Sequence, residues 1–560
     1  MHAMRRAVTL LLLCACASPP RDNHEAVIEA LALDRSDAVV PRTPLPDALP
    51  ADFAALPPEQ RDAALLAMLS SDDPRARFLA RQIRTLYFSS IYAPPSAAAS
   101  PAHPPPFPSA AWTVADEADW LIVGSGPAGS VLAHELRRGG RRVLMVEQGP
   151  LVWPGGPDTR ALPHLVDARP TVDGSLLVRT GRAVGGGTTV NVDLAFAPTL
   201  PAVRRRLETW SWDVDAFARA DEWVRPTIGT RAVDTSEINA NNRILWDGAQ
   251  AIGLAPSLYA LNTHPVGDKR SAVSGLLAPA LLDRENPLLL LADTRVERVT
   301  FDGARATGVE LADGRRLKAR RVVLCAGALG STLILMRSHV ANDHIGRGVV
   351  AHPSIPIVGQ FDRVIDAHEG TPASVYVDRS DRGYMLEAMS AGPDYLAAMW
   401  PGTAREVREA VRNYRRMGGF GVMLVDSPHD DNRIAADGTI TYRLSDAGAA
   451  RLLDGVREGV RIMFKAGAAR VALPTVEWPI LTRPEDADRP LRFIPSATLL
   501  TSAHLQSTCK MGRVVDREHR VIGRENLYVV DSSVFPESCG ANPMQTIYAM
   551  AKVFADRMHR

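Results

Sequence analysis

A glycine-rich turn between two short apolar segments constrains the fold of this chain more than any other feature. Residues 119–123 predict a buried strand, the residues up to Arg138 predict a helix, and residues 142–147 predict a second strand. The turn at residues 124–129 reads Gly-Ser-Gly-Pro-Ala-Gly. This is the GxGxxG pattern that joins strand to helix in a dinucleotide-binding unit. The sequence therefore predicts a Rossmann-like α/β domain.

The residue types in this turn suit the binding of a pyrophosphate. Gly124 permits the tight turn, Gly126 lets the pyrophosphate approach the backbone, and Gly129 allows the helix to pack closely on the strand. The N-terminus of the helix then faces the phosphates. Glu147 ends the second strand, where its carboxylate can accept hydrogen bonds from the ribose hydroxyls of an adenosine. The predicted cofactor-binding residues of this unit are Gly124, Ser125, Gly126, Pro127, Ala128, Gly129 and Glu147.

Length and composition indicate a folded protein with more than one structural unit. A chain of 560 residues exceeds what one compact core accommodates, so we expect about two to four units. The 64 Lys and Arg residues nearly balance the 63 Asp and Glu residues, and no basic run suggests a nucleic-acid partner. Cys325, Cys509 and Cys539 show no metal-ligand spacing, so we expect no metal site. We expect free thiols rather than a Cys509–Cys539 disulfide.

The N-terminus resembles an export signal. Residues 1–6 carry two arginines, residues 7–13 are apolar, and small residues follow through Ala17. The apolar run is too short for a membrane-spanning helix, which needs about 20 residues. Two processing sites stay open: cleavage after Ala15, which leaves Cys16 as a lipidated first residue, or cleavage after Ala17. We therefore expect export to a bacterial periplasm, with contact to the membrane only through a lipid anchor at Cys16.

Three further segments carry a resemblance to a known family. Residues 181–191 read GRAVGGGTTVN, which is too dense in glycine for a helix or strand. Residues 321–331 read RVVLCAGALGS, and residues 345–353 read IGRGVVAHP. Together with the first glycine turn, these segments resemble the glucose-methanol-choline (GMC) family of FAD-dependent oxidoreductases. Gly348 stands where the family usually has asparagine.

The resemblance implies a non-covalent FAD cofactor. In the family, the second glycine-rich segment runs under the flavin and the pyrophosphate, and the residue at the position of Asn191 lies near the isoalloxazine ring. Some members carry a histidine here that bonds to FAD, whereas this chain has Thr188, Thr189 and Val190. No second dinucleotide unit follows, so we expect the electrons to come from the substrate. The implied cofactor contacts are Gly185, Gly186, Gly187, Asn191, Ala326, Gly327, Asp531, Pro543 and Met544.

The C-terminal part of the chain carries the candidate catalytic residues. Residues 502–512 read SAHLQSTCKMG, and Asn542 and Pro543 precede a helical pattern. When hydride leaves an alcohol carbon the hydroxyl proton must leave too, and an imidazole titrates near the working pH. The resemblance implies that His504 is the general base and that Asn542 hydrogen-bonds the substrate oxygen. Pro543 pre-organises a helix N-terminus that can stabilise negative charge on reduced flavin.

The resemblance also implies the architecture. We expect an α/β fold in which a Rossmann-like FAD-binding domain is interwoven with an α+β substrate-binding domain built on an antiparallel sheet, plus an N-terminal helical extension. The expected ranges are a signal peptide at 1–17, a helical extension at 18–92, a Pro/Ala-rich linker at 93–114, the FAD-binding domain at 115–200, 287–352 and 498–560, a substrate or cap region at 201–286, and a substrate-binding domain at 353–497.

The expected activity is the oxidation of a small-molecule alcohol to a carbonyl by hydride transfer to flavin N5. Oxygen, a quinone or a cytochrome would then accept the electrons. The chain looks most similar to the long-chain alcohol and sterol oxidases, although the cysteine-rich segment of some members is absent around residues 264–274. Two alternatives stay open: a flavin-dependent lyase or decarboxylase of the same fold, and a non-catalytic FAD-binding lipoprotein.

Overall fold

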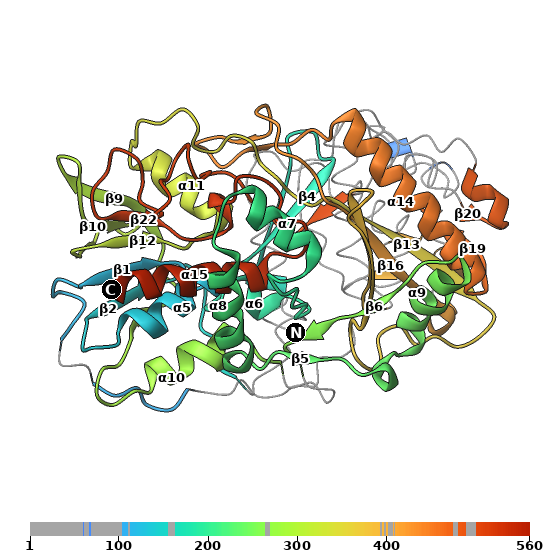
Figure 1. Cartoon of the computed structure of the whole chain (residues 1–560), viewed down its shortest axis with the longest axis horizontal. Coiled ribbons are helices and arrows are strands. Elements are labelled where there is room, and N and C mark those ends of the chain that lie inside the picture. Colours follow the sequence, from blue (N-terminus) through green and yellow to red (C-terminus); the bar gives the residue numbers. More distant parts are fainter. Residues whose placement is uncertain are drawn as a thin grey trace.

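The computed structural model places the sequence motifs within two sheets. It describes residues 104–109, 112–154, 163–263, 269–392, 412–473, 480–488 and 500–559, together with a few isolated positions. The expected signal peptide, the expected helical extension and most of the expected linker lie outside the described residues. Figure 1 shows the two sheets beside one another along the longest axis of the molecule.

The first sheet has five parallel strands and forms around the glycine turn. β1 (Trp120–Val123) lies at its centre between β2 (Val143–Val146) and β12 (Val322–Leu324). β8 (Leu289–Leu291) pairs with β2, and β22 (Leu527–Val529) pairs with β12. The central strands are apolar and buried throughout, as expected for parallel strands that are covered on both faces. The prediction of a Rossmann-like α/β domain is therefore confirmed.

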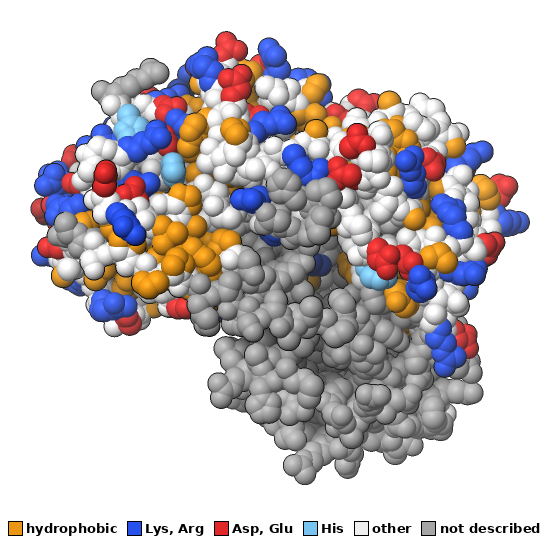
Figure 2. All heavy atoms as spheres, turned by 90° about the horizontal axis from the view of Figure 1, so that it is seen from below, with side chains coloured by type: hydrophobic (Ala, Val, Ile, Leu, Met, Phe, Trp, Pro, Cys, Tyr) orange, Lys and Arg blue, Asp and Glu red, His pale blue; other side chains and the backbone are white. Residues whose placement is uncertain are grey.

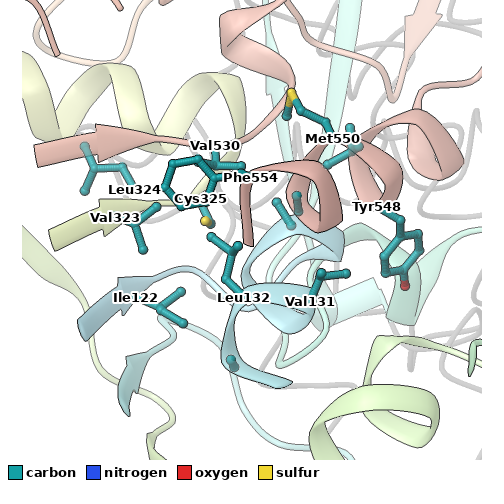
Figure 3. Close-up of a cluster of buried hydrophobic side chains, with 14 of the residues drawn as sticks. Ile122, Val131, Leu132, Val323, Leu324, Cys325, Val530, Tyr548, Met550 and Phe554 are labelled. Atoms are coloured by element: carbon teal, nitrogen blue, oxygen red, sulfur yellow. The ribbon is translucent and has the colours of Figure 1, made fainter. Parts of the chain in front are cut away.

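Two helices pack with this sheet. α5 (Pro127–Leu136) follows the glycine turn directly, and α15 (Met544–His559) packs along α5. Figure 3 shows Val131 and Leu132 of α5 in one buried cluster with Phe554 of α15 and side chains of the strands. α5 and α15, which are far apart in the sequence, thus pack together beside the glycine turn at residues 124–129.

A separate antiparallel sheet of three strands packs against β12. Its strands are β9 (Val296–Asp302), β10 (Arg305–Leu311) and β11 (Arg316–Lys318). α11 (Gly327–Arg337) leaves β12 and packs against β9. This arrangement places the start of α11 at the same edge of the parallel sheet as the start of α5.

The second sheet has ten strands and is mostly antiparallel, with β4 and β21 running parallel. Its order is β3-β4-β21-β13-β16-β15-β14-β6, and β19 and β20 extend it beside β13. The bounds are β3 (Val166–Pro170), β4 (Leu176–Gly181), β6 (Ser257–Leu258), β13 (Ser354–Phe361), β14 (Val375–Arg379), β15 (Tyr384–Ala388), β16 (Met417–Leu424), β19 (Ala468–Ala472), β20 (Ile480–Leu481) and β21 (Leu500–Ser502).

Two helices pack against the second sheet. α14 (Asp446–Lys465) contacts β13, β15 and β16, and α9 (Ala240–Ala251) contacts β14 and β16. Ser445 caps α14 by accepting a hydrogen bond from the backbone N–H of Gly448. The remaining helices and strands are α6 (Gly187–Val190), α7 (Pro201–Thr209), α8 (Val214–Thr227), α10 (Ala278–Leu281), β5 (Arg231–Ala232), β7 (Ala260–Leu261), β17 (Arg433–Ile434) and β18 (Ile440–Thr441).

The sheets divide the chain differently from the expected ranges. β3 and β4 fall within the range 115–200 expected for the FAD-binding domain, yet both belong to the second sheet. β21 falls within the range 498–560 and also joins the second sheet through β4 and β13. β3 and β4 form a local hairpin, and β4 joins the second sheet by pairing with β21, which is distant in sequence, so their sheet is set by tertiary hydrogen bonding rather than by the local pattern.

The described surface and interior show several further features. Cys325, Cys509 and Cys539 are all buried free thiols, which confirms the expectation that Cys509 and Cys539 form no disulfide.

Within the described ranges, none of the helices is both long and apolar enough to cross a membrane. The same residues contain no cluster of three or more His, Cys, Asp or Glu side chains suited to a metal ion. Figure 2 shows basic and acidic side chains interspersed over the described part of one face, so neither sign dominates it.

Candidate active site

The first glycine turn depends on two backbone contacts. Gly124 has a φ of +96°, and a Cβ there would lie 2.5 Å from the carbonyl oxygen of Cys325. A Cβ on Gly129 would lie 2.0 Å from the carbonyl oxygen of Gly124. At Gly126, in contrast, a Cβ would meet nothing within 4 Å. The space beside Gly126 at the start of α5 is therefore open, and it fits a pyrophosphate bound by the helix N-terminus.

The second glycine segment folds directly against the first turn. A Cβ on Gly186 would lie 2.8 Å from the Cα of Gly126. The backbone N–H of Gly185 donates to Ser125 Oγ at 3.0 Å. Gly187 begins α6, and a Cβ on it would again meet no protein atom within 4 Å. Two segments about sixty residues apart thus form one open cradle, as a bound dinucleotide requires.

Glu147 holds the first glycine turn in place through hydrogen bonds to Ser125 and Gly149. Its carboxylate accepts hydrogen bonds from the backbone N–H of Ser125 at 3.0 Å, from Ser125 Oγ at 2.7 Å and from the backbone N–H of Gly149 at 2.9 Å. Burial raises the pKa of Glu147, and these hydrogen bonds oppose that shift. The ribose contact itself stays a prediction.

Asp531 joins two other segments at the same edge of the sheet. Its carboxylate accepts from the backbone N–H of Gly327 at 3.0 Å, from Ser331 Oγ at 2.5 Å and from the backbone N–H of Ser533 at 2.9 Å. Asp531 therefore caps the short helix that begins at Ser532 and also holds the start of α11. Gly327 has a φ of +74° and open space where a Cβ would lie, next to the predicted cofactor residue Ala326.

Asn191 and Met544 are brought together by the fold. Asn191 Nδ2 lies 3.1 Å from Met544 Sδ. The backbone oxygen and Oδ1 of Asn191 both accept from Lys269 Nζ, at 2.5 and 3.1 Å. Lys269 also lies 3.2 Å from the buried carboxylate of Asp193. Sequence reasoning missed Lys269 and Asp193, because neither falls in a glycine motif or in a catalytic segment.

The predicted catalytic residues are linked through Gln506. His504 is half-buried, and burial lowers the pKa of its imidazole to about 4. Gln506 Nε2 donates to the backbone oxygen of His504 at 3.3 Å, while Gln506 Oε1 accepts from the backbone N–H of Cys539 at 3.0 Å. The loop from Cys539 leads into Asn542, whose buried Oδ1 has no hydrogen-bond partner among the described residues. Such an atom fits the contact with a bound molecule.

A second histidine lies beside His504. The ring of His352 meets that of His504 edge to face, with the ring centroids 5.5 Å apart. His352 Nε2 lies 2.5 Å from Ser538 Oγ, and the backbone of His352 has a φ of +50°. Its backbone N–H donates to buried Asp426 at 2.9 Å. Burial lowers the pKa of His352 well below its usual value. His352 belongs to the segment IGRGVVAHP that carries the family resemblance, but the sequence alone did not reveal its contact with His504.

Gly348 shows how the chain tolerates its departure from the family pattern. A Cβ on Gly348 would lie 2.1 Å from Lys510 Nζ. The ammonium group therefore occupies the space into which a side chain at position 348 would extend. Burial lowers the pKa of Lys510. The glycine at 348 and the lysine at 510 are consequently matched to one another.

The fold and the cradle define an FAD-dependent oxidoreductase that acts on alcohols. The chain belongs to the GMC oxidoreductase family, whose sequence models match residues 118–354 and 421–551. FAD is the cofactor, as membership of this family of flavoenzymes shows. The resemblance inferred from the sequence is confirmed.

Several relatives can be compared over most of the chain. An uncharacterised GMC-type oxidoreductase of Mycobacterium tuberculosis is 27% identical over 479 residues, which cover 79% of this chain and 75% of the relative. A long-chain-alcohol oxidase of Arabidopsis thaliana is 26% identical over 512 residues, covering 79% of this chain and 66% of the relative. These alignments extend across both sheets.

Two solved structures share the fold. Pyridoxine 4-oxidase from Mesorbium loti has a TM-score of 0.61 at 18% identity and covers 79% of this chain and 99% of its own. A formate oxidase has a TM-score of 0.56 at 14% identity and covers 80% of this chain and 98% of its own. At these identities the likeness concerns the fold alone.

Replacing Gly126 with valine is expected to weaken FAD binding by about 100-fold or more without unfolding the protein, because the new side chain fills the space open to the pyrophosphate. The extended backbone of Gly126 (φ −60°, ψ −169°) accommodates valine. The purified variant should lack the flavin absorbance and should melt at the temperature of the flavin-free parent.

The matched control is Gly303→Asn, at the turn between β9 and β10. This site is equally open, and asparagine tolerates its φ of +59°. The control should stay yellow and release its flavin on denaturation. A Gly126→Val protein that binds FAD as tightly as the parent would contradict the prediction that the pyrophosphate binds in the open space beside Gly126.

Proposed function

We propose that His504 is the general base in the oxidation of an apolar alcohol to a carbonyl. When bound, FAD supplies the two-electron acceptor by taking a hydride at flavin N5. His504 accepts the hydroxyl proton, so the alcohol loses one hydride and one proton and becomes an aldehyde or ketone. Asn542 orients the substrate oxygen, and it cannot replace His504 as a proton acceptor.

The observation that carries this proposal is the link that Gln506 makes between the loop leading into Asn542 and the backbone of His504. Because its pKa is lowered to about 4, the imidazole is neutral and able to accept a proton at every pH above that value. Asn542 lies just before α15, and the N-terminus of this helix favours negative charge in the region of Pro543. The neutral imidazole is free to take the hydroxyl proton, and the positive helix end favours the negative charge that a flavin would gain with the hydride.

Two finer features of the proposal concern the cofactor and the substrate. We infer that FAD is held non-covalently, because α6 reads Gly-Thr-Thr-Val and offers no histidine. Similarity to the Arabidopsis long-chain-alcohol oxidase supports an apolar alcohol as the substrate, with oxygen, a quinone or a cytochrome as the final electron acceptor.

Anaerobic mixing of the holoenzyme with a panel of alcohols tests the reaction. A long-chain alcohol or a sterol should bleach the flavin absorbance, whereas His504→Ala should keep its flavin and be reduced about 100-fold more slowly or worse. The control is His519→Ala. His519 also has a pKa lowered by burial to about 4, but its ring packs against Trp212 and Phe554.

The control should lower the melting temperature and leave the reduction rate per bound flavin near that of the parent. If His504→Ala is reduced as fast as the parent, His504 is not the base. If no alcohol, sugar or sterol bleaches the parent, the chain does not oxidise alcohols and the lyase alternative gains.

We also propose that the protein is exported and carries a lipid on Cys16, because residues 1–17 combine arginines, an apolar run and small residues. Mass spectrometry of the native N-terminus should find a diacylglycerol-modified Cys16. Cys16→Ser should abolish the modification and release the protein from the membrane fraction. An unmodified N-terminus at Ser18 would instead establish ordinary secretion.

A further inference from the structure

His352 is a buried residue with a strained backbone beside the proposed base. Only 1% of the residue is exposed, and its ring meets the ring of His504 edge to face. Its φ of +50° lies in the left-handed region, which is uncommon for residues other than glycine. A residue in this conformation persists only where its surroundings hold it, and such residues gather at functional sites.

The backbone of His352 is held from two sides. The carboxylate of Asp426 accepts from the N–H groups of Ala351 and His352, at 3.0 and 2.9 Å. Ser502 Oγ donates to the backbone oxygen of Ala351 and accepts from the backbone N–H of His504 at 3.2 Å. The backbone of His352 is therefore fixed relative to that of His504.

The orientation of the Gln506 side chain is set by one backbone contact. Its Oε1 accepts from the backbone N–H of Cys539 at 3.0 Å, and a backbone N–H group only donates. The other end of the amide is therefore the NH₂ group, which lies 3.3 Å from the backbone oxygen of His504 and 3.2 Å from His352 Nε2. Because an amide NH₂ group only donates, His352 Nε2 is the acceptor.

A second donor reaches the same ring nitrogen. Ser538 Oγ accepts from the backbone N–H of Gly540 at 3.1 Å, so its own proton is left to donate to His352 Nε2, 2.5 Å away. A nitrogen that accepts carries no proton, so the ring of His352 is neutral and protonated on Nδ1. His352 Nδ1 is buried without a hydrogen-bond partner among the described residues.

These contacts join the two segments that carry the proposed catalytic residues. Gln506 belongs to the segment of His504 and bonds to its backbone oxygen. Ser538 belongs to the loop that leads through Asn542 into α15. A base and an amide on separate segments act on one alcohol only while their separation is fixed, and a misplacement of about 1 Å can cost about 100-fold in rate.

We propose that His352 is a positioning residue that, by accepting two hydrogen bonds at Nε2, fixes the base His504 relative to the amide of Asn542. The inference rests on the proposed function, because it takes His504 as the base and Asn542 as the group that orients the alcohol. The role depends on the acceptor nitrogen of His352 and not on any titration of its ring.

Two substitutions separate the acceptor nitrogen from the volume of the ring. His352→Phe keeps a flat ring and leaves both donors without a partner, whereas the amide oxygen of His352→Gln can accept from both. Both variants carry the same backbone strain. In anaerobic mixing with an alcohol that reduces the parent, His352→Phe should keep its flavin and be reduced about 100-fold more slowly, and His352→Gln should restore the rate to within about threefold of the parent.

A solvent isotope effect identifies the step that His352→Phe slows. A displaced His504 takes the hydroxyl proton more slowly, so heavy water should slow flavin reduction more in His352→Phe than in the parent or in His352→Gln. In a His504→Ala background, His352→Phe should have far less effect than in the parent, because the base that it positions is absent.

The matched control is His519→Phe. His519 is also buried, has a φ of +63°, and meets the ring of Phe554 edge to face. Its Nδ1 lies 3.1 Å from the backbone oxygen of Val529 in β22, so it bonds to the parallel sheet rather than to either segment of the site. This variant should melt at a lower temperature and keep the rate and the isotope effect of the parent.

Nitrogen NMR of the substrate-free holoenzyme tests the position of the proton without relying on the reaction. The histidine ring signals that disappear in His352→Gln should show a protonated Nδ1 and an unprotonated Nε2 between a pH of about 5 and a pH of about 8. A proton on Nε2, or a charged ring, would overturn the proposal.

The kinetic outcomes decide the positioning role independently of the proposed function. An unchanged rate in His352→Phe, or a folded His352→Gln that is reduced as slowly as His352→Phe, contradicts it. If His352→Phe does not fold, His352→Gln still has to fold and to keep the rate and the isotope effect of the parent. Failure of the proposed function would show separately, as an unchanged rate in His504→Ala.

Discussion

The contact between backbones at the two glycine segments is the constraint on which the rest of the site depends. The carbonyl oxygen of Cys325 lies where a side chain at Gly124 would begin, and the Cα of Gly126 lies where one at Gly186 would begin. No other residue allows such an approach, so three distant segments meet at the ends of the parallel strands. The open space beside Gly126 and Gly187 exists because the surrounding backbone is packed this tightly.

Burial then sets the chemistry of the polar groups around this cradle. Glu147 and Asp531 are satisfied by backbone N–H groups and hydroxyls rather than by arginine or lysine, so they stiffen turns without placing cations near the cofactor. His504 and Glu387 are shifted in opposite senses, because burial disfavours the charged form of each. A neutral imidazole and a largely protonated carboxyl group can therefore coexist between a pH of about 4 and a pH of about 7.

The sequence predicts the parts of this site that lie in local motifs. Gly124, Gly126 and Gly129 stand at fixed spacing between a strand and a helix, and His504 and Asn542 stand in segments whose order matches a family. Glu387 has no such signal. It reads as one residue of the strand Tyr-Met-Leu-Glu-Ala, and only the pairing of β14, β15 and β16 buries it. β3 and β4 escaped prediction for the same reason, since their sheet is chosen by β21.

The two residues proposed to be catalytic come from different sheets, and this explains why their alignment needs a dedicated connection. His504 follows β21 of the second sheet, whereas Asn542 precedes α15, which packs on the parallel sheet. Gln506 bonds to both segments, and the contact between His352 and Ser538 joins them a second time.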